Sequence, residues 1–185
     1  IALIEKLDLI GTHHILLVLE TPDLPELSLP HEPHGLEVVC PVGDPNNLGA
    51  LIRSALAFGV SKIILTKNSC DPFNQKTIKS SSGAVLTAPL ARLNKVLNEV
   101  SISELSKADL GLDLQGEKIT QFDWPANCRL WLGEEGPGLK IIPTQQCLHI
   151  PISQIESLNV SIAGSISFFS YHSYQQRKMS AGAIK

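Results

Sequence analysis

Three short segments of the chain carry residue types and spacings that could do chemistry. The first, at 44–55, reads DPNNLGALIRSA and contains Asn47 and Arg53. Asn47 lies where an asparagine side chain can cap the start of a helix. Arg53 lies farther along the same helix, and its planar guanidinium with five N–H donors suits a phosphate group. A lone arginine is also commonly a solvated surface charge, so this segment alone leaves both interpretations open.

The second segment, at 130–139, places three glycines within six residues directly after an apolar run. Gly133, Gly136 and Gly138 allow the backbone to turn sharply and to approach a ligand closely. Their order, Gly-x-x-Gly-x-Gly, differs from the Gly-x-Gly-x-x-Gly of a dinucleotide-binding loop, which argues against an oxidoreductase of the Rossmann type. A tight turn without any ligand would need the same glycines.

The third segment, at 150–161, reads IPISQIESLNVS. Pro151 ends the apolar run before it, because proline cannot donate to a central strand. Ser157 or Asn159 can cap the helix that we expect to follow. Structural capping would explain both residues, but it does not explain the two other segments.

The composition predicts one globular domain with a sizeable core. The chain has 185 residues, of which 43% are hydrophobic and 18% charged, and its formal net charge is −3. A negative net charge argues against nucleic-acid binding by bulk electrostatics. Any binding of RNA would therefore depend on a local surface patch, a groove formed by a dimer or a separate module. The chain begins at Ile1 rather than methionine, so we expect a fragment or a processed form.

Metal and membrane signals are missing from the sequence. The cysteines, at 40, 70, 128 and 147, form no Cys-x-x-Cys pair, and the histidines form no His-Glu-x-x-His motif, so no metal is expected. We expect reduced, mostly buried thiols. No run approaches the roughly 20 apolar residues of a membrane helix, and the N-terminus lacks the basic, apolar and small-residue order of a signal peptide. The expected location is the cytoplasm.

The elements that must position these segments alternate between short apolar runs and helical spacings, which predicts an α/β fold with a parallel sheet. Expected strands cover 37–40, 62–66, 84–87, 108–112, 129–132 and 147–150. Expected helices cover 48–58, 73–80, 90–100 and 158–177. Gly59 would end the first helix, and Asp71-Pro72 would begin the second.

The two ends of the chain carry further expectations. Residues 1–35 contain four prolines between positions 22 and 33, and we interpret them as the tail of a preceding N-terminal module plus a linker. Residues 36–185 would form the catalytic domain. In the last helix Ile162, Ile166 and Phe169 repeat on one face. Periodicity alone does not distinguish packing inside one subunit from packing against a partner subunit.

Together, the three segments resemble the motifs of the SpoU (TrmH-like) branch of the SPOUT methyltransferases, in the same order. The resemblance covers about 36–178 and includes Lys79-Ser80-Ser81-Ser82-Gly83-Ala84, which is similar to the family's Ser-x-Gly-Ala segment. The residues that match the three motifs are Asn47, Gly49 and Arg53; Gly133, Glu135, Gly136, Gly138 and Leu139; and Ile150, Pro151, Ser157, Leu158, Asn159, Val160, Ser161 and Ala163. One departure is Glu134, because serine or threonine often precedes the motif glutamate.

This resemblance implies a parallel sheet with helices on both faces and a C-terminal trefoil knot, which is an exception to the rule that chains avoid knots. It implies that S-adenosylmethionine binds in the knot. The backbones of Gly133, Ile150 and Leu158 would hold the cofactor, Leu132 would add to an apolar wall for adenine, and Gly138 would complete the loop.

The implied reaction is methyl transfer to a ribose 2′-hydroxyl of RNA, which needs a group that removes or accepts one proton. The resemblance assigns this role to Arg53, yet arginine is normally protonated. We therefore expect Arg53 and Asn47 to bind RNA, with Arg53 holding phosphate and ribose. Asn159, Ser157 and Glu135 would set the catalytic geometry.

Substrate and assembly are also expectations from this resemblance. We expect ribosomal RNA rather than transfer RNA, because residues 1–35 look like the end of an additional module. A homodimer through the C-terminal helix would bring Arg53 near the partner's cofactor pocket. The alternative function is a non-catalytic SPOUT domain that binds RNA or assists ribosome assembly.

Overall fold

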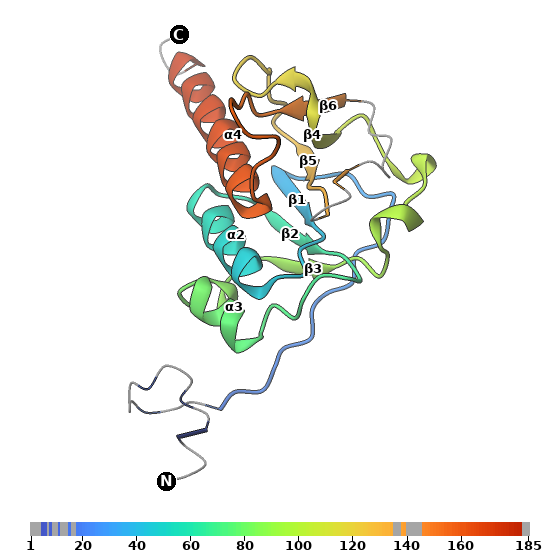
Figure 1. The fold of residues 1–185 in the computed structure, drawn as a ribbon. Coiled ribbons are helices and arrows are strands. Elements are labelled where there is room, and N and C mark those ends of the chain that lie inside the picture. Colours follow the sequence, from blue (N-terminus) through green and yellow to red (C-terminus); the bar gives the residue numbers. More distant parts are fainter. Residues whose placement is uncertain are drawn as a thin grey trace.

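The computed structural model describes residues 18–134, 138–139 and 146–182, together with residues 5, 6, 8, 11 and 15. Its centre is a six-stranded sheet in the order β3-β2-β1-β5-β4-β6, and its neighbouring strands are parallel (Figure 1). The strands are β1 Leu36–Cys40, β2 Lys62–Leu65, β3 Leu90–Arg92, β4 Asp109–Lys118, β5 Cys128–Trp131 and β6 Gln146–His149. The helices are α2 Pro45–Ala57, α3 Gln75–Ser80, α4 Val160–Gly182 and the 3-10 turns η1 Ala84–Leu86, η2 Leu97–Glu99 and η3 Ile102–Glu104. The predicted α/β class with a parallel sheet is confirmed.

Helix α2 begins earlier than its apolar spacing predicts. Asp44 is the N-cap, and its side chain accepts hydrogen bonds from the backbone N–H groups of Asn46 and Asn47. The expectation that Asn47 caps this helix is therefore wrong, because Pro45 takes the first helical position and Asp44 precedes it. The expected end is confirmed: Gly59 has a φ of 71°, a left-handed conformation that suits glycine.

Two further expected elements are wrong. The expected strand at 84–87 is the turn η1, because Ser82 and Gly83, with φ values of 53° and 80°, redirect the chain after α3. The expected helix at 90–100 is instead β3 followed by η2. Its residues 90–92 pair with β2 at 63–65, and these sheet hydrogen bonds replace a helical turn. The third strand along the chain is therefore β3, and not the expected strand at 84–87.

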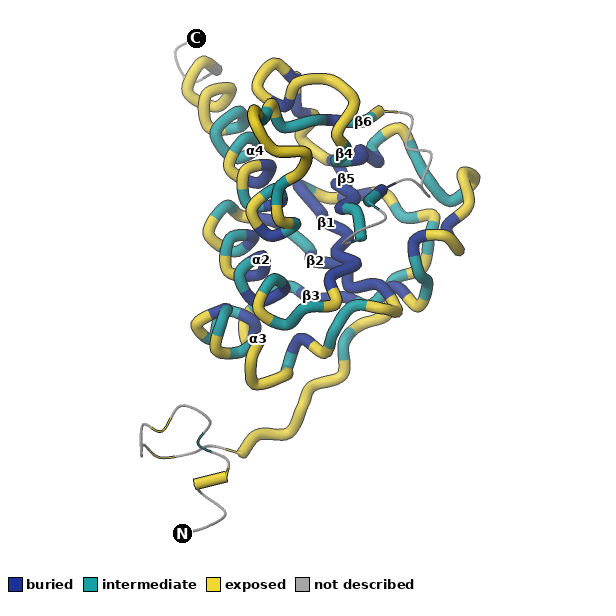
Figure 2. The backbone as a smooth tube through the Cα atoms, in the orientation of Figure 1, coloured by how far each residue is buried: buried dark blue, intermediate teal, exposed yellow. Residues whose placement is uncertain are grey.

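The two faces of the sheet are covered differently. Helices α2, α3 and α4 lie against one face, while η2 and η3 lie on the other (Figure 1). Figure 2 shows that the buried residues concentrate along the strands and on the sides of α2 and α4 that face them. Within the described residues, the second face carries only single 3-10 turns in place of the expected helices. Leu93, Leu97 and Val100 pack against the strands on this face.

The chain from Leu24 onward already packs against the sheet. Leu24 contacts the larger core cluster, and Leu27 and Leu29 contact the smaller one. The N–H of Leu27 donates to the carbonyl of Arg92 at 2.8 Å, and the N–H of Arg92 donates to the carbonyl of Pro25 at 2.9 Å. This part of the expected linker therefore extends the sheet beyond β3.

A network of buried charges lies near the amino ends of the central strands. Arg129 is paired in register with both Glu37 and Asp109. Its Nε donates to Glu37 Oε2 at 3.2 Å, and its Nη1 donates to Asp109 Oδ1 at 3.0 Å. Trp131 Nε1 also donates to Asp109 Oδ1, at 2.7 Å. The three charged side chains thus satisfy one another inside the fold.

The described part of the chain offers neither a membrane helix nor a metal cluster. None of its helices is long and apolar enough to cross a membrane. No group of three or more His, Cys, Asp or Glu residues in it could hold a metal ion. The four cysteines are free thiols, and burial raises the pKa of Cys128 to about 12, so this thiol stays protonated at neutral pH.

Candidate cofactor site

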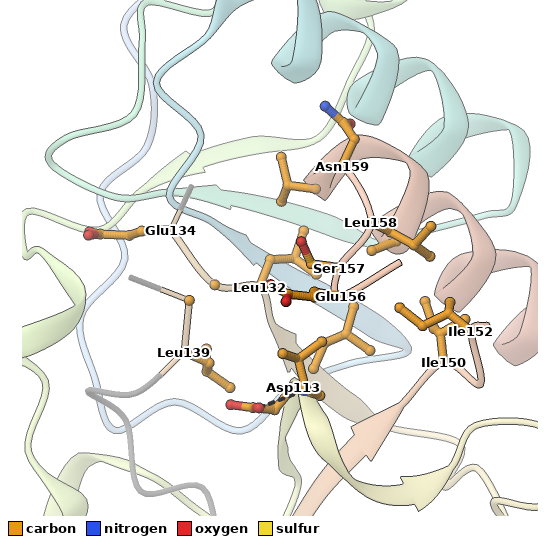
Figure 3. A pocket seen from close by; sticks show the side chains of 16 residues that line it. Asp113, Leu132, Glu134, Leu139, Ile150, Ile152, Glu156, Ser157, Leu158 and Asn159 are labelled. Atoms are coloured by element: carbon orange, nitrogen blue, oxygen red, sulfur yellow. Dashed lines mark hydrogen bonds between the residues drawn. The ribbon is translucent and has the colours of Figure 1, made fainter. Parts of the chain in front are cut away.

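A cavity of about 510 Å³ opens at the carboxyl ends of β4, β5 and β6. Parallel sheets commonly bind ligands at this edge, because the loops that follow the strands converge there. The residues that line the cavity are Leu112, Asp113, Leu114, Leu132, Gly133, Glu134, Gly138, Leu139, Ile150, Ile152, Glu156, Ser157, Leu158, Asn159, Val160 and Ala163 (Figure 3). The second and third sequence segments thus meet in one site.

The glycine segment forms one wall of the cavity with its backbone. Glu134 and Gly138 exchange two backbone hydrogen bonds, at 3.2 and 3.0 Å. A Cβ on Gly133 would lie 2.7 Å from the carbonyl carbon of Gly138 and 2.8 Å from the nitrogen of Leu139. Only glycine therefore fits at position 133 without moving the loop. Glu135, for which we expected a catalytic role, lies outside the described residues.

The third segment supplies the opposite wall and the start of α4. The side chain of Asn159 accepts hydrogen bonds from the N–H of Ser161 at 2.9 Å and from its hydroxyl at 2.6 Å. Asn159 is therefore the residue that caps α4, while the exposed Ser157 lines the cavity. Apolar surface from Leu158, Ile150 and Leu132 faces the same space.

One hydrogen bond connects the first segment to a residue that lines the cavity. Asn159 Nδ2 donates to Asn47 Oδ1 at 3.0 Å, which links the start of α2 to the start of α4. Neither Asn47 nor Arg53 is among the lining residues. Arg53 is exposed on α2, and its Nη1 donates to Ser82 Oγ at 2.9 Å. The structure thus groups Ser157 and Asn159 with the cofactor residues and places Arg53 apart from them.

Gly49 of the first segment has a packing role. A Cβ at this position would lie 2.7 Å from the carbonyl oxygen of Thr77 and 2.8 Å from the nitrogen of Ser81. Glycine therefore allows α2 to approach the end of α3 closely. This contact holds the turn that carries Ser82, the hydrogen-bond partner of Arg53.

Sequence reasoning missed the part of the cavity that β4 supplies. The pairing of β4 with β6 shifts register between Leu112 and Glu117, and the intervening bulge brings Asp113 and Leu114 to the cavity. Gly116 makes this possible, since a Cβ there would lie 2.2 Å from the carbonyl oxygen of Cys147. A glycine inside a strand is the signal that could have predicted the bulge.

The cavity is acidic. Asp113 and Glu156 contribute carboxylates, and the lining residues within the described part of the chain include no lysine or arginine. Glu156 lies toward the middle of the site in Figure 3, whereas the Glu134 side chain extends away from the other carboxylates. There, Glu134 Oε1 accepts a 2.6 Å hydrogen bond from Asn68 Nδ2. An apolar wall with nearby carboxylates suits a ligand that is partly aromatic and carries positive charge.

These features define an α/β protein with a small-molecule site built from backbone and apolar side chains at the carboxyl ends of its strands. Residues 37–169 match the model of the SpoU rRNA Methylase family. The match covers well over half of the chain and includes all three segments. The chain therefore belongs to the SpoU rRNA Methylase family.

Individual relatives agree with this membership. A protein from Syntrophobacter fumaroxidans named "Ribosomal RNA small subunit methyltransferase G 2" is 37% identical over 175 residues, which are 92% of this chain and 34% of that protein. The "23S rRNA (guanosine-2'-O-)-methyltransferase RlmB" of Xylella fastidiosa strain Temecula1 is 37% identical over 136 residues, covering 69% of this chain and 54% of that protein. The chain thus spans about half or less of these relatives.

A solved structure shows the same architecture. The AdoMet-bound rRNA methyltransferase from Sinorhizobium meliloti superposes with a TM-score of 0.63 at 28% sequence identity. The superposition covers 80% of this chain and 59% of that chain. The α/β architecture of this chain is therefore also found in an rRNA methyltransferase.

Proposed function

We propose that this chain is the catalytic unit of an S-adenosylmethionine-dependent methyltransferase that acts on a ribose 2′-hydroxyl of RNA, with ribosomal RNA as the substrate rather than transfer RNA. The observation that carries this proposal is the convergence of the glycine segment and the 150–159 segment on one cavity. The names of the Syntrophobacter and Xylella relatives support ribosomal RNA, and the Xylella relative's name specifies 2′-O-methylation.

The cavity fits the proposed cofactor in size, shape and charge. Its volume of about 510 Å³ lies within the usual range for small-molecule sites. Leu132, Ile150 and Leu158 offer the apolar surface that an adenine ring needs, and the backbone of Gly133 and Gly138 can approach the ligand closely. S-adenosylmethionine supplies an electrophilic methyl group on a positively charged sulfur, and a cavity rich in carboxylates favours this charge.

The transfer itself requires alignment of the ribose and the loss of one proton. The ribose 2′-oxygen forms a bond to the methyl carbon, the carbon–sulfur bond breaks, and the hydroxyl proton leaves. In our proposal Arg53 and Asn47 bind the RNA, with Arg53 holding phosphate and ribose. Ser157, Asn159 and Glu135 orient the reacting groups. Because a guanidinium offers hydrogen-bond donors and no acceptor, the proton passes to another group such as the substrate phosphate.

We further propose a homodimer that forms through α4. Ile162, Ile166 and Phe169 on this helix are 51%, 36% and 55% exposed, a run of apolar surface that a second copy would cover. Arg53 is exposed and does not line the cavity of its own chain, which supports its action at the partner's cavity. The same proposal includes a C-terminal segment that is threaded as a trefoil knot. It also includes a location in the cytoplasm, where RNA is modified.

Substitution of Phe169 by aspartate is expected to prevent dimerisation, because it would bury a charge in the apolar contact. We expect the dimer dissociation constant to rise by at least about 100-fold, as for a central interface residue. Light scattering at micromolar concentration measures this. Leu86→Asp, which changes a 56% exposed apolar residue outside α4, is the matched control. A wild-type chain that is monomeric under these conditions would overturn the proposed dimer.

The alanine substitution at Gly133 should weaken cofactor binding. The new Cβ would overlap the Gly138 backbone, at 2.7 Å, and the loop that walls the cavity must move. We expect the Kd for S-adenosylmethionine to rise by at least about tenfold, as measured by isothermal titration calorimetry. Gly43→Ala is the control, since a Cβ there meets nothing within 4 Å. Equal affinity of the two variants would show that the loop does not contact the cofactor.

The experiment that tests the function is methyl transfer from tritiated S-adenosylmethionine into total RNA, followed by nucleoside analysis. We expect label in 2′-O-methylated nucleosides of ribosomal RNA. Label in a base would contradict the proposed reaction class. RNA binding without any transfer would favour the non-catalytic RNA-binding or assembly role.

A further inference from the structure

The loop after β2 is tied to the glycine segment of the cavity by one hydrogen bond. Asn68 Nδ2 donates to Glu134 Oε1 at 2.6 Å, across 66 positions of sequence. In the SpoU family, serine or threonine is common at the position that Glu134 occupies in this chain. A serine hydroxyl at 134 would lie two side-chain carbons closer to its own backbone than this carboxylate does. The glutamate at this position thus has a partner that a shorter side chain would not reach.

Asn68 is itself held firmly. The hydroxyl of Thr66 donates to Asn68 Oδ1 at 2.6 Å, which orients the amide so that its NH₂ group faces Glu134. Thr66 is fully buried, and its hydroxyl also lies 3.1 Å from Ser69 Oγ. Ser69 Oγ donates to the carbonyl of Cys40 at 2.6 Å, at the end of β1. A chain of side-chain hydrogen bonds therefore runs from Thr66, directly after β2, through Asn68 to Glu134.

At its other end this chain reaches the backbone that walls the cavity. Glu134 exchanges two backbone hydrogen bonds with Gly138, and the Gly133 backbone packs against Gly138. The side chain of Glu134 leaves the cavity, as Figure 3 shows, while its backbone lies in the lining. Glycine leaves a backbone many conformations, so the bond to Asn68 restricts the backbone of Glu134, which lies beside Gly133.

We propose that Asn68 is a positioning residue that, through Glu134, holds the backbone that Glu134 and Gly138 contribute to the cavity wall in the conformation that binds the cofactor. The inference rests on the proposed function, because it assumes that S-adenosylmethionine is the ligand of this cavity. Asn68 is not among the lining residues, and its effect is to reduce the conformational freedom that binding must remove. It acts on cofactor affinity and leaves the stability of the fold almost unchanged.

The test is titration calorimetry with S-adenosylmethionine on the whole 185-residue chain, combined with thermal unfolding of each variant. Asn68→Ala should raise the Kd about three- to tenfold, the range for loss of one typical hydrogen bond, with no resolved change in Tm. Glu134→Ser should raise it equally, and the double variant should be no worse than either single variant. Glu134→Gln keeps an acceptor oxygen and should bind almost as the wild type does.

The chain contains a matched control for this pair. Asn94 Nδ2 donates to Glu26 Oε1 at 2.7 Å, also between exposed side chains, but away from the cavity. Asn94→Ala should therefore leave the Kd unchanged. A wild type that binds no S-adenosylmethionine would overturn the proposed function. A wild type that binds, with Asn68→Ala binding equally well or with independent, additive effects of the two residues, would overturn the role of Asn68 alone.

Discussion

Replacement of Arg129 by alanine is expected to lower the free energy of unfolding by about 3–5 kcal/mol, the cost of removing one partner from a buried ion network. The guanidinium is fully buried and bonds both Glu37 and Asp109. Without it, two buried carboxylates lose their shared positive charge, although Lys62 Nζ still lies 3.1 Å from Glu37 Oε1. Urea unfolding at neutral pH, followed by circular dichroism, measures the loss.

The partly exposed pair of Lys95 and Glu104 provides the control. Lys95 Nζ lies 2.6 Å from Glu104 Oε1, yet its side chain is 37% exposed. Lys95→Ala should therefore cost no more than about 1 kcal/mol. A similarly small loss in Arg129→Ala would show that the buried carboxylates are compensated by other groups.

The same network predicts how stability depends on pH. Burial raises the pKa of Glu37, but the hydrogen bond from Lys62 and the charge of Arg129 outweigh it, so the pKa lies below its usual value of 4.5. A carboxyl whose pKa is lowered by folding stabilises the protein above its unfolded pKa and loses this contribution as pH falls. The wild type should therefore lose stability below about pH 4.5, and Arg129→Ala should lose less over that range.

This network also shows what the sequence alone could not predict. Glu37, Asp109 and Arg129 each lie inside or beside an expected strand, where a charge looks like an exposed edge position. Their compensation depends on the pairing of β1 and β4 with β5, which sets the three residues side by side. Strand order is a long-range property, and no local pattern determines it.

Local patterns predicted the fold well where a stop signal or a buried run was strong. Gly59 marked the end of α2, and the apolar runs marked five of the six observed strands. The failure at 90–100 has a physical cause. Leu93, Leu97 and Val100 have helical spacing and are all buried, but tertiary contacts to the second face of the sheet and pairing with β2 override this local preference.

The residues of the candidate site were likewise predicted where the signal was local and missed where it depended on long-range contacts. Residues within the motif segments were predicted to meet, and Gly133, Ser157, Leu158 and Asn159 do line one cavity. Asp113 and Asn68 were missed, because a strand bulge brings the first to the cavity and a contact between distant loops connects the second to it. Neither the bulge partner nor the loop contact can be read from nearby residues.

Arg53→Ala should reduce methyl transfer by at least about 100-fold, because it removes the charged fork that we assign to the RNA phosphate and ribose. Its affinity for S-adenosylmethionine should stay within about twofold, since Arg53 does not line the cavity. Lys107→Ala, which removes one exposed positive charge before the amino end of β4, is the control for net charge. An Arg53→Ala variant with normal turnover would contradict the assignment.

A mixture of two impaired variants, assayed at an S-adenosylmethionine concentration between the wild-type Kd and the raised Kd of Gly133→Ala, tests whether Arg53 serves the partner's cavity. The Arg53→Ala chain keeps an intact cavity, and the Gly133→Ala chain keeps an intact Arg53. If the arginine acts across a dimer, half of the dimers in an equal mixture contain both chains, and each has one complete site. Activity should then recover to about a quarter of the wild-type value. If Arg53 serves its own chain, each variant lacks one half of the same site, and the mixture is no more active than the two variants measured separately.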